Sequence, residues 1–217
     1  VKLYFMQGHP TETDDDLRGI NDLARDVIEE YYKNPDRKKG RTPRVTISCA
    51  CFIPKPFTPF QWEPQDSMEE AKRKQEFIKS TITDRRIKYN YHDAEVSRIE
   101  AVFARGSRRL SAPLLEAAKR GVMFDAWEEL FDYEGWLDIF RSCGVDPAFF
   151  AEREIPEDEI LPWDVIDAGI RKDFLLSERR RAYEGRITPD CVHGCAGCGA
   201  NKLGGELTCC PKPPKKN

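Results

Sequence analysis

The sequence predicts an α/β fold, and three observations near its N-terminus support that class. An apolar run occupies residues 1–6 (VKLYFM), and a second run, rich in β-branched residues, occupies 44–54 (RVTISCACFIP). Both runs have the composition of buried strands. Between them, the apolar residues of segment 14–34 recur at helical spacing. A strand, a helix and a strand without hairpin signals form a βαβ unit, so we expect a parallel sheet whose strands are buried on both faces.

Segment 14–34 also carries signals for both ends of a helix. Thr13 and Asp16 have the spacing of a capping box, acidic residues fill the first turn, and Pro35 follows the last turn. One face of the helix is apolar and consists of Leu17, Ile20, Ala24, Val27, Ile28 and Tyr31. We expect this face to pack against the sheet. Ser67 starts a further helix as an N-cap.

The chain divides into three parts by its pattern. Residues 85–92 (RRIKYNYH) have the composition of a third strand, so the sheet part covers 1–92. Short helices broken by glycines are expected over 93–186, and the last of them ends on Gly185. A cysteine-rich segment and tail occupy 187–217.

Bulk composition excludes several classes of protein. The 217 residues are 34% charged and 40% hydrophobic, which is ordinary for a soluble globular protein. The formal net charge of −3 argues against a protein that coats nucleic acid non-specifically. No apolar run is long enough to span a bilayer and no signal peptide opens the chain, so we expect no membrane association. The chain starts with Val1, inside a strand-like run and without a methionine, so we expect a fragment of a longer protein.

Five of the eight cysteines fall within residues 191–210. This distribution is unlike a secreted disulfide scaffold, so we expect a reducing, cytoplasmic compartment. Cys191, Cys195 and Cys198 are interleaved with glycines, which suits a tight site for zinc or an auxiliary iron–sulfur cluster. The candidates for a fourth ligand are Cys209, Cys210 and His193. The alternative is that these thiols are free or paired in disulfides.

Six strings, taken in order, resemble one protein family. They are KLYFMQGHPTETDDDL (2–17), FIPKPFTPFQW (52–62), HDAEVSRIEAVFARGSRRL (92–110), FDAWEELF (124–131), LPWDVIDAGI (161–170) and TPDCVHGCAGCG (188–199). Together they cover almost the whole chain and resemble the C-terminal half of a family of radical S-adenosylmethionine proteins that contain a cobalamin-binding domain. The chain departs from the family pattern at Gln7, His9, Ser107 and Ala126, and an acid is usual where Ser107 stands.

The resemblance implies a partial (β/α) radical S-adenosylmethionine barrel, followed by a mostly helical region and the cysteine-rich tail. It places the first barrel strands, the loop that holds the catalytic 4Fe–4S cluster and the cobalamin domain upstream of Val1, in the missing N-terminal part of the same protein. Cys191, Cys195 and Cys198 have the C-x3-C-x2-C spacing of that catalytic loop, but they follow the barrel instead of opening it. The resemblance therefore implies an enzyme fragment that is not a complete catalyst alone.

Two strand ends are candidate cofactor sites, because residues at the C-terminal ends of barrel strands face the active site. The candidate residues are Gly8, Thr11, Glu12, Phe52, Ile53 and Lys55. Gly8 allows close approach of a ligand, Phe52 suits packing against adenine, and Lys55 suits a carboxylate or phosphate. By the resemblance, the cofactor is S-adenosylmethionine, and we expect these residues around a shared concavity. The alternatives are a glycine–proline turn and aromatic packing at a barrel mouth.

Arg105, Arg108 and Arg109 fall within one turn (ARGSRRL). Three guanidinium groups at this spacing suit a phosphate, a carboxylate or a nucleic-acid backbone, so they are candidate substrate-binding residues. The alternative is a solvated or salt-bridged helix face, with Glu95 and Glu100 upstream as partners.

Two functions compete at the level of sequence. The first is the C-terminal part of a radical S-adenosylmethionine enzyme that acts on RNA or a ribosome-associated substrate, a substrate class that rests on analogy with methylthiotransferases alone. The second is a non-enzymatic, metal-stabilised module in which the arginine turn and the cysteine segment bind RNA or a protein partner.

Overall fold

The computed structural model describes residues 1–37, 40–125, 127–192 and 194–202. The chain forms two compact units. The first combines residues 1–53 with 64–153, and the second combines residues 54–63 with the described residues from 154 onward. Within the described ranges, no helix is both long enough and apolar enough to cross a membrane.

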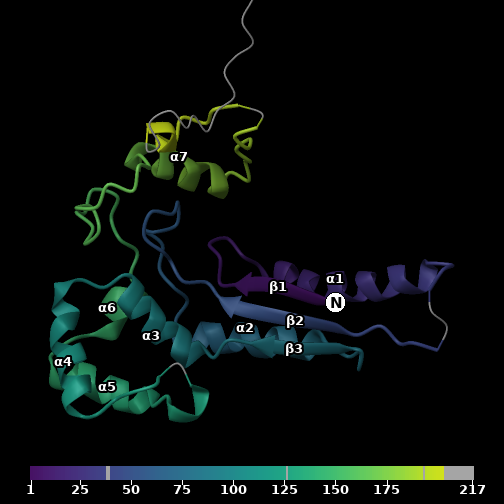
Figure 1. Cartoon of the computed structure of the whole chain (residues 1–217), viewed down its shortest axis with the longest axis horizontal. Coiled ribbons are helices and arrows are strands. Elements are labelled where there is room, and N and C mark those ends of the chain that lie inside the picture. The colour runs from purple at the N-terminus through teal and green to yellow at the C-terminus, as the bar shows by residue number, and fades with distance from the viewer. Residues whose placement is uncertain (38–39, 126, 193, 203–217) are drawn as a thin grey trace, which may run out of the picture. The chain divides into compact units, whose positions relative to one another are not determined.

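The first unit is built on a three-stranded parallel sheet with the order β1-β2-β3 (Figure 1). The strands are β1 (Lys2–Gln7), β2 (Val45–Cys51) and β3 (Ile87–Tyr91). Leu3 lies opposite Ile47 where β1 pairs with β2, and Val45 lies opposite Ile87 where β2 pairs with β3. The predicted α/β class and the parallel pairing of the two N-terminal apolar runs are confirmed.

Two helices cover one face of this sheet. Helix α1 (Asp14–Lys33) begins at the capping box formed by Thr13 and Asp16, as predicted. Helix α2 (Met68–Thr81) begins at Ser67, whose side chain accepts a hydrogen bond from the backbone of Glu70. The two helices and the sheet share one core, which consists of Leu17, Ile20, Ala24, Ile28, Val45, Ile47, Cys49, Ile78 and Ile87. The predicted packing of the first helix is confirmed.

The opposite face of the sheet is more exposed than predicted. Side chains alternate along each strand, so Tyr4 and Met6 point away from α1 and α2, and they are 73% and 45% exposed. On the same face, β2 contributes the half-buried residues Thr46, Ser48 and Ala50. The expectation that these strands are buried on both faces is wrong, because only alternate residues enter the core and the others on β2 are small or polar.

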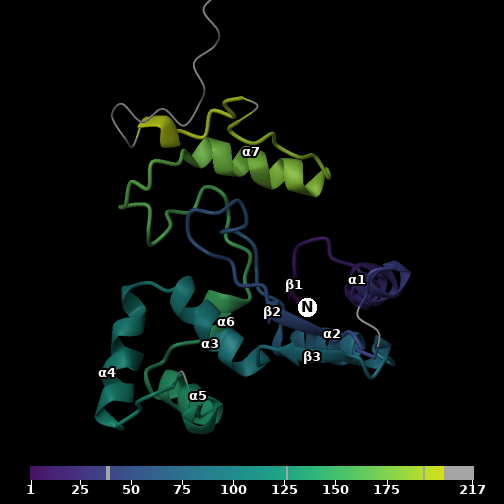
Figure 2. The ribbon, with the colours of Figure 1, turned by 45° about the vertical axis from the view of Figure 1, so that its right-hand side comes forward.

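Four further helices belong to the first unit and gather beyond the C-terminal ends of the strands (Figures 1 and 2). They are α3 (Ala94–Ala104), α4 (Ser111–Lys119), α5 (Tyr133–Ser142) and α6 (Pro147–Ala151), with the 3-10 helices η1 (Arg108–Leu110) and η2 (Glu128–Leu130) between them. The compact unit therefore extends past the boundary predicted near residue 92. One reason is that Gln65 donates hydrogen bonds both to the Phe52 carbonyl, at the end of β2, and to the Ser97 carbonyl in α3.

The second unit contains α7 (Lys172–Tyr183) and the 3-10 helix η3 (Ala200–Lys202). Trp62 is fully buried in its core, together with Ile155, Leu161, Trp163 and Leu175. The indole N–H of Trp163 donates to Gln61 at 2.7 Å, which ties segment 54–63 to this unit. Gly185 follows α7 with a φ of 66°, so the predicted glycine at the end of this helix is confirmed.

An ion cluster around Arg179 joins the segments of the second unit. The guanidinium group of Arg179, on α7, contacts Glu63 and Glu154 at 2.6 Å each and Glu157 at 2.9 Å. The hydroxyl of Tyr183 donates to the second carboxylate oxygen of Glu63 at 2.8 Å. The side chain of Glu63 is 4% exposed, so these donors compensate a carboxylate that has lost its water.

Candidate functional site

The chain turns sharply where β1 ends, at the C-terminal edge of the sheet. Gly8 has a φ of 91°, and a Cβ at this position would lie 2.8 Å from Oδ2 of Asp66. A larger residue would therefore displace Asp66 and strain the backbone. Thr11 has a φ of 68°, which is rare for a β-branched residue. Because the conformation of Thr11 is costly, neighbouring contacts must hold the turn.

An ion cluster made of Glu12, Asp66, Glu70 and Lys74 holds this turn. Glu12 accepts a hydrogen bond from the backbone N–H of Gly8 at 2.8 Å, and the same oxygen lies 3.1 Å from Nζ of Lys74. Lys74, on α2, also contacts Asp66 at 2.9 Å, and Glu70 lies 4.0 Å away. The side chains of Lys74 and Glu12 are only 8% and 7% exposed. The cluster thus links the turn after β1, the segment before α2 and α2 itself.

The carboxylates keep Lys74 charged despite its burial. Burial alone would lower the pKa of Lys74, but the hydrogen bonds from its ammonium group to Asp66 and Glu12 raise that pKa above its ordinary value. Two carboxylates around one ammonium leave these three side chains with a net charge of −1. The surroundings of the turn therefore favour a cationic group on a ligand.

An aromatic pair lies beside the turn. The ring centroids of His9 and Phe52 are 5.0 Å apart, with Phe52 buried and His9 exposed. The backbone N–H of Phe52 donates to the carbonyl of Gln7 at 2.7 Å, which ties the end of β2 to the end of β1. Within the first unit, the structure thus brings Gly8, Glu12 and Phe52 to the same edge of the sheet.

The other predicted cofactor residues have different surroundings. Ile53 packs against the core of the α3–α6 helices. Lys55 belongs to the second compact unit, where its carbonyl accepts a hydrogen bond from the hydroxyl of Thr58. Inside the first unit, the structure therefore groups only part of the predicted set, because the chain leaves this unit after Ile53.

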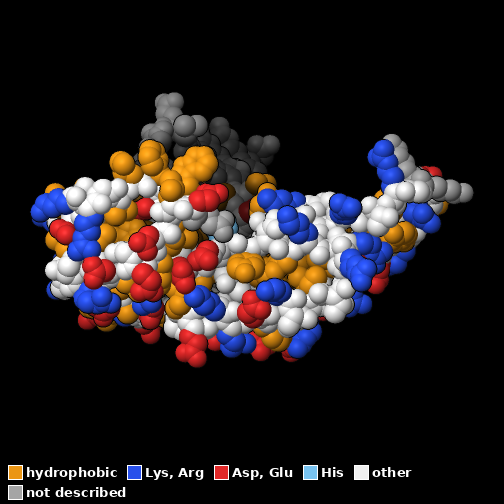
Figure 3. Space-filling model, turned by 90° about the horizontal axis from the view of Figure 1, so that it is seen from below, with side chains coloured by type: hydrophobic (Ala, Val, Ile, Leu, Met, Phe, Trp, Pro, Cys, Tyr) orange, Lys and Arg blue, Asp and Glu red, His pale blue; other side chains and the backbone are white. Residues whose placement is uncertain are grey.

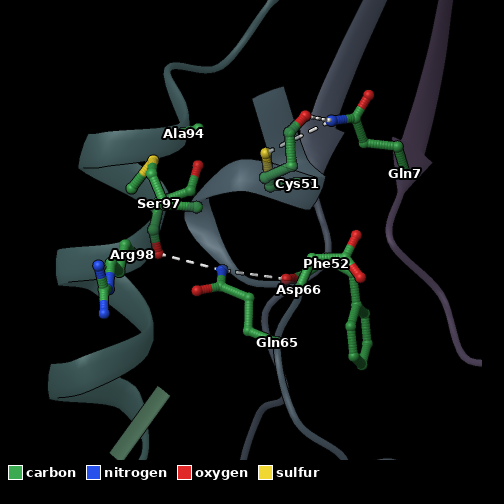
Figure 4. Close-up of a pocket in the computed structure, with 10 residues that line it drawn as sticks. Gln7, Cys51, Phe52, Gln65, Asp66, Ala94, Ser97 and Arg98 are labelled. Atoms are coloured by element: carbon green, nitrogen blue, oxygen red, sulfur yellow. Dashed lines mark hydrogen bonds between the residues drawn. The ribbon is translucent and has the colours of Figure 1, made fainter. Parts of the chain in front are cut away.

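Buried amides lie under the same edge, and no motif in the sequence indicated them. Gln7 is 2% exposed and donates toward Sγ of Cys51 at 3.8 Å, while Gln65 spans the gap between the carbonyls of Phe52 and Ser97 (Figure 4). The hollow among these side chains leaves room for about one water molecule. It is too small for a cofactor, so these amides support the site rather than line it. The available signal was Gln7, a polar residue within an apolar strand.

Two thiols in β2 are inert at neutral pH. Burial raises the pKa of Cys49 to about 12, and the adjacent Cys51 adds to the shift. Burial also raises the pKa of Cys51, which opposes the effect of its hydrogen-bond donors. Both groups therefore stay protonated and are not thiolate nucleophiles.

The three arginines of the predicted substrate site have unequal roles. Arg105 is 3% exposed, and its guanidinium group donates to the carbonyls of Ala151 at 2.6 Å and Arg153 at 2.7 Å. It is therefore a packing residue that fixes the end of α6, rather than an exposed ligand-binding group. Arg108 and Arg109 are exposed, so they stay predicted substrate-binding residues.

The cysteine segment lies in the second unit. The carbonyl of Cys198 accepts a hydrogen bond from the backbone N–H of Arg171 at 2.9 Å. Cys191 and Cys195 are exposed and Cys198 is half-buried. In the part of the chain that the structure describes, no three His, Cys, Asp or Glu side chains are arranged to hold a metal ion. Three predicted ligands, Cys209, Cys210 and His193, lie outside the described residues, so the metal site stays a prediction.

Comparison with known proteins adds one relative. The uncharacterized protein MJ0966 of Methanocaldococcus jannaschii is 31% identical to this chain over an alignment of 149 residues, and the match covers 64% of this chain. The match covers 31% of that relative, so this chain corresponds to about a third of its length. No family model matches the chain. No solved structure matches it.

Proposed function

We propose that this chain is the C-terminal part of a radical S-adenosylmethionine enzyme, with the first unit supplying the last βα elements of a partial (β/α) barrel. The upstream part of the same protein carries the remaining strands, the catalytic 4Fe–4S cluster and a cobalamin domain. The substrate is RNA or a ribosome-associated molecule, and the compartment is the cytoplasm. The six strings that resemble this family support the proposal.

The unequal faces of the sheet are the observation that carries this proposal. In a (β/α) barrel, helices cover the outer face of the parallel strands and the inner face lines the interior. Here α1 and α2 pack on one face, while Tyr4 and Met6 on the other are exposed. An open parallel sheet normally has helices on both faces, so this arrangement fits a barrel wall better.

The residues at the turn after β1 suit S-adenosylmethionine, which carries cationic ammonium and sulfonium groups. Bound there, the cofactor supplies radical chemistry upon one-electron reduction. Gly8 permits close approach of a ligand, and His9 and Thr11 in the same turn are exposed. Glu12 accepts the hydrogen bond from the backbone N–H of Gly8, and Lys74 pairs with Glu12. Together with Asp66, these side chains keep the local charge negative.

The test uses the full-length protein that contains this chain, reconstituted anaerobically with iron and sulfide. We expect it to bind S-adenosylmethionine in equilibrium dialysis and to release methionine when dithionite is added. Gly8→Ala should weaken both, because a φ of 91° strains an alanine and the new Cβ would displace Oδ2 of Asp66, 2.8 Å away. Gly19→Ala is the matched control, since a Cβ there meets nothing within 4 Å. Wild-type protein without methionine release, or Gly8→Ala protein with unchanged binding, would contradict the proposal.

The cysteine segment favours a second function, a metal-stabilised module that binds RNA or a protein. The loop that contains Cys191, Cys195 and Cys198 supports this second function. The carbonyl of Cys198 accepts a hydrogen bond from the backbone N–H of Arg171, which connects the loop to the segment before α7. Metal analysis of the purified chain should find zinc or iron, and chelation should expose additional reactive thiols. Buried Cys49 serves as the internal control, because it should react only after denaturation. Metal-free protein whose three loop thiols all titrate without denaturant would exclude this function.

A further inference from the structure

The sheet face opposite α1 and α2, called the open face below, has a regular chemical pattern. Alternate residues of each strand point to it, and these are Lys2, Tyr4 and Met6 on β1, Thr46, Ser48 and Ala50 on β2, and Lys88 and Asn90 on β3. None of these side chains belongs to a hydrophobic core cluster of the described residues. Because most of the open face is polar and none of it is packed in a core, its composition suits a ligand better than a protein interior.

The parallel register aligns these side chains in rows that run across the strands. From the beginning of the strands to their ends, the rows consist of Lys2, Thr46 and Lys88, then Tyr4, Ser48 and Asn90, then Met6 and Ala50. Successive rows are about 7 Å apart, because each residue of a strand advances the backbone by about 3.3 Å. The open face is therefore cationic at the N-terminal ends of the strands, polar in the middle and apolar at the C-terminal edge, where the candidate site lies.

The first row concentrates positive charge. Lys2 and Lys88 lie on the two edge strands, so their backbones are separated by two strand spacings, or about 10 Å. Neither lysine forms an ion pair with a described carboxylate, and the open face contains no acidic side chain. By contrast, the chain has a formal net charge of −3, and basic and acidic side chains are interspersed on the side of the molecule seen in Figure 3. The open face thus attracts anions locally.

The middle row supplies an aromatic ring and unused hydrogen-bonding groups. Tyr4 is 73% exposed, and Nζ of Lys2 lies 4.7 Å from the centroid of its ring. The hydroxyl of Ser48 and the side-chain amide of Asn90 make no hydrogen bond with any residue that the structure describes. An exposed ring stacks on nucleobases, and hydroxyl or amide groups hydrogen-bond a base edge or the 2′-hydroxyl of RNA. The middle row therefore matches the part of a nucleotide that is not phosphate.

We propose that the open face binds an unpaired nucleotide of single-stranded RNA. Lys2 and Lys88 contact phosphates, and the base stacks on Tyr4. Ser48 and Asn90 hydrogen-bond the base edge or the 2′-hydroxyl. Charge complementarity selects this ligand, because a polyanion matches a face with lysines and no acid, and the exposed ring favours nucleic acid over an acidic peptide.

The order of the rows also orients the bound nucleotide. Its phosphates lie toward the N-terminal ends of the strands, and its base lies toward the C-terminal edge, beside the turn after β1. The inference rests on the proposed function for the choice of RNA as substrate, and it assigns that substrate to one surface of the first unit. An enzyme that modifies a base must hold that base unstacked, which a single nucleotide on this face satisfies.

The test measures binding of fluorescein-labelled oligouridylate to the full-length protein that contains this chain. Fluorescence anisotropy is recorded over a series of salt concentrations. Tyr4→Leu should weaken binding about tenfold, because the stacking of one base is lost. Lys88→Ala should weaken binding about fivefold and reduce the slope of log K against log salt by about one, as loss of one phosphate contact requires.

Matched substitutions in the first unit control for total charge and aromatic content. Lys119→Ala removes the same charge from α4, and Tyr32→Leu removes an exposed ring from α1. Both should change the affinity by less than about twofold and leave the salt slope unchanged, because neither residue lies on the open face. Circular dichroism of each variant checks that the fold is retained. Unlabelled oligodeoxyuridylate should compete less well than unlabelled oligouridylate, and equal competition would contradict RNA as the ligand.

Equilibrium dialysis with S-adenosylmethionine on the same variants separates this inference from the proposed function. Lys88→Ala and Tyr4→Leu should bind the cofactor as the wild type does, because Gly8 and Glu12 are unchanged. A wild type that binds oligouridylate through Tyr4 and Lys88 but releases no methionine would contradict the proposed function alone. A wild type that binds the cofactor but not oligouridylate, or equal losses of RNA affinity in Lys88→Ala and Lys119→Ala, would overturn the inference.

Discussion

Among the residues that the structure describes, Lys74 in the first compact unit and Arg179 in the second each contact several carboxylates, and the two clusters differ in what surrounds the cation. In the first unit, Lys74 contacts Glu12, whose side chain is 7% exposed, and Asp66, whose side chain is 23% exposed. In the second, Arg179 contacts Glu63, which is 4% exposed, together with two carboxylates that are 62% and 42% exposed. The lysine cluster thus has more of its charge inside the protein.

The two clusters serve different purposes, which follow from the geometry of their cations. A lysine ammonium is a compact charge that several oxygens can surround, whereas an arginine guanidinium presents a planar fork to separate carboxylates. Lys74 pairs with Glu12, which accepts the hydrogen bond from the backbone N–H of Gly8. The pairing of Lys74 therefore stabilises the turn of the candidate site. Arg179 joins α7 to the segment that contains Glu63, so its pairing bears on the fold of the second unit. Four predictions test this contrast.

We expect the largest effect on the free energy of unfolding when Lys74 is replaced. Lys74→Met leaves Glu12 and Asp66 facing each other without the ammonium, so we expect the free energy of unfolding to fall by roughly 3–5 kcal/mol. Urea unfolding measures the loss, and hydrogen–deuterium exchange locates it in the first unit. The control is Arg73→Met, at the preceding position. Loss of the exposed ion pairs of Arg73 with Asp14 and Glu70 should lower the free energy of unfolding by less than about 1 kcal/mol. Equal losses in the two variants would remove the special role of Lys74.

Loss of Arg179 should cost less. In Arg179→Met the two exposed carboxylates regain water, and only Glu63 stays buried, with the hydroxyl of Tyr183 as a remaining donor. We expect a loss of about 2 kcal/mol, confined to exchange-protected peptides of the second unit. Arg180→Met, an exposed neighbour on α7, is the control and should be nearly neutral. A loss larger than that of Lys74→Met would reverse the comparison.

The lysine cluster should also give a distinct response to alkali. The pKa of Lys74 is raised above 10.5, so the stability that its charge contributes is complete below that pH and is lost as the pH rises through the folded-state pKa. The difference in unfolding free energy between wild type and Lys74→Met should therefore stay constant up to about pH 10 and then shrink. Urea titrations at a series of pH values measure it. A difference that grows in alkali would contradict the assignment.

The smallest effect concerns the half-buried pair of Asp84 and Arg86, which serves as the reference for both clusters. Hydrogen bonds from Arg86 lower the pKa of Asp84 to about 2, so this pair contributes stability above the ordinary value of 3.8 and loses it as the pH falls toward 2. Carbon-13 NMR of the carboxyl group should show this pKa, and Arg86→Gln should return it toward 3.8. The change in unfolding free energy at neutral pH should be under about 1 kcal/mol. An unshifted Asp84 in the wild type would refute the pairing.

Much of the fold follows from local signals in the sequence. The apolar runs, the capping residues Thr13 and Ser67, and Gly185 predicted elements that the structure contains. These signals work because strand alternation, helix caps and left-handed glycines depend on neighbours within a few positions. The prediction that both sheet faces are buried was wrong. The apolar composition of β1 does not reveal which alternate residues pack against another element.

The candidate site was less accessible to the same reasoning. Gly8, Glu12 and Phe52 were identified because each lies at or just after the C-terminal end of a predicted strand. Lys74 and Asp66 were not, since their contacts with the turn cross more than fifty positions of sequence and no spacing rule connects them. Arg105 was grouped with its neighbours in one turn, although burial sends its guanidinium group to the carbonyls at the end of α6.

Composition and local pattern alone determine that this chain forms parallel strands joined by capped helices, because each of those features is encoded within one or two turns of backbone. The tertiary structure alone decides which charges become buried and whom they pair with. Lys74 and Arg73 are adjacent on α2, yet one is 8% exposed within a shared cluster and the other 45% exposed at the surface. The physical reason is desolvation: the free energy of a charge depends on the water and partners around it, and those are set only when distant segments pack together.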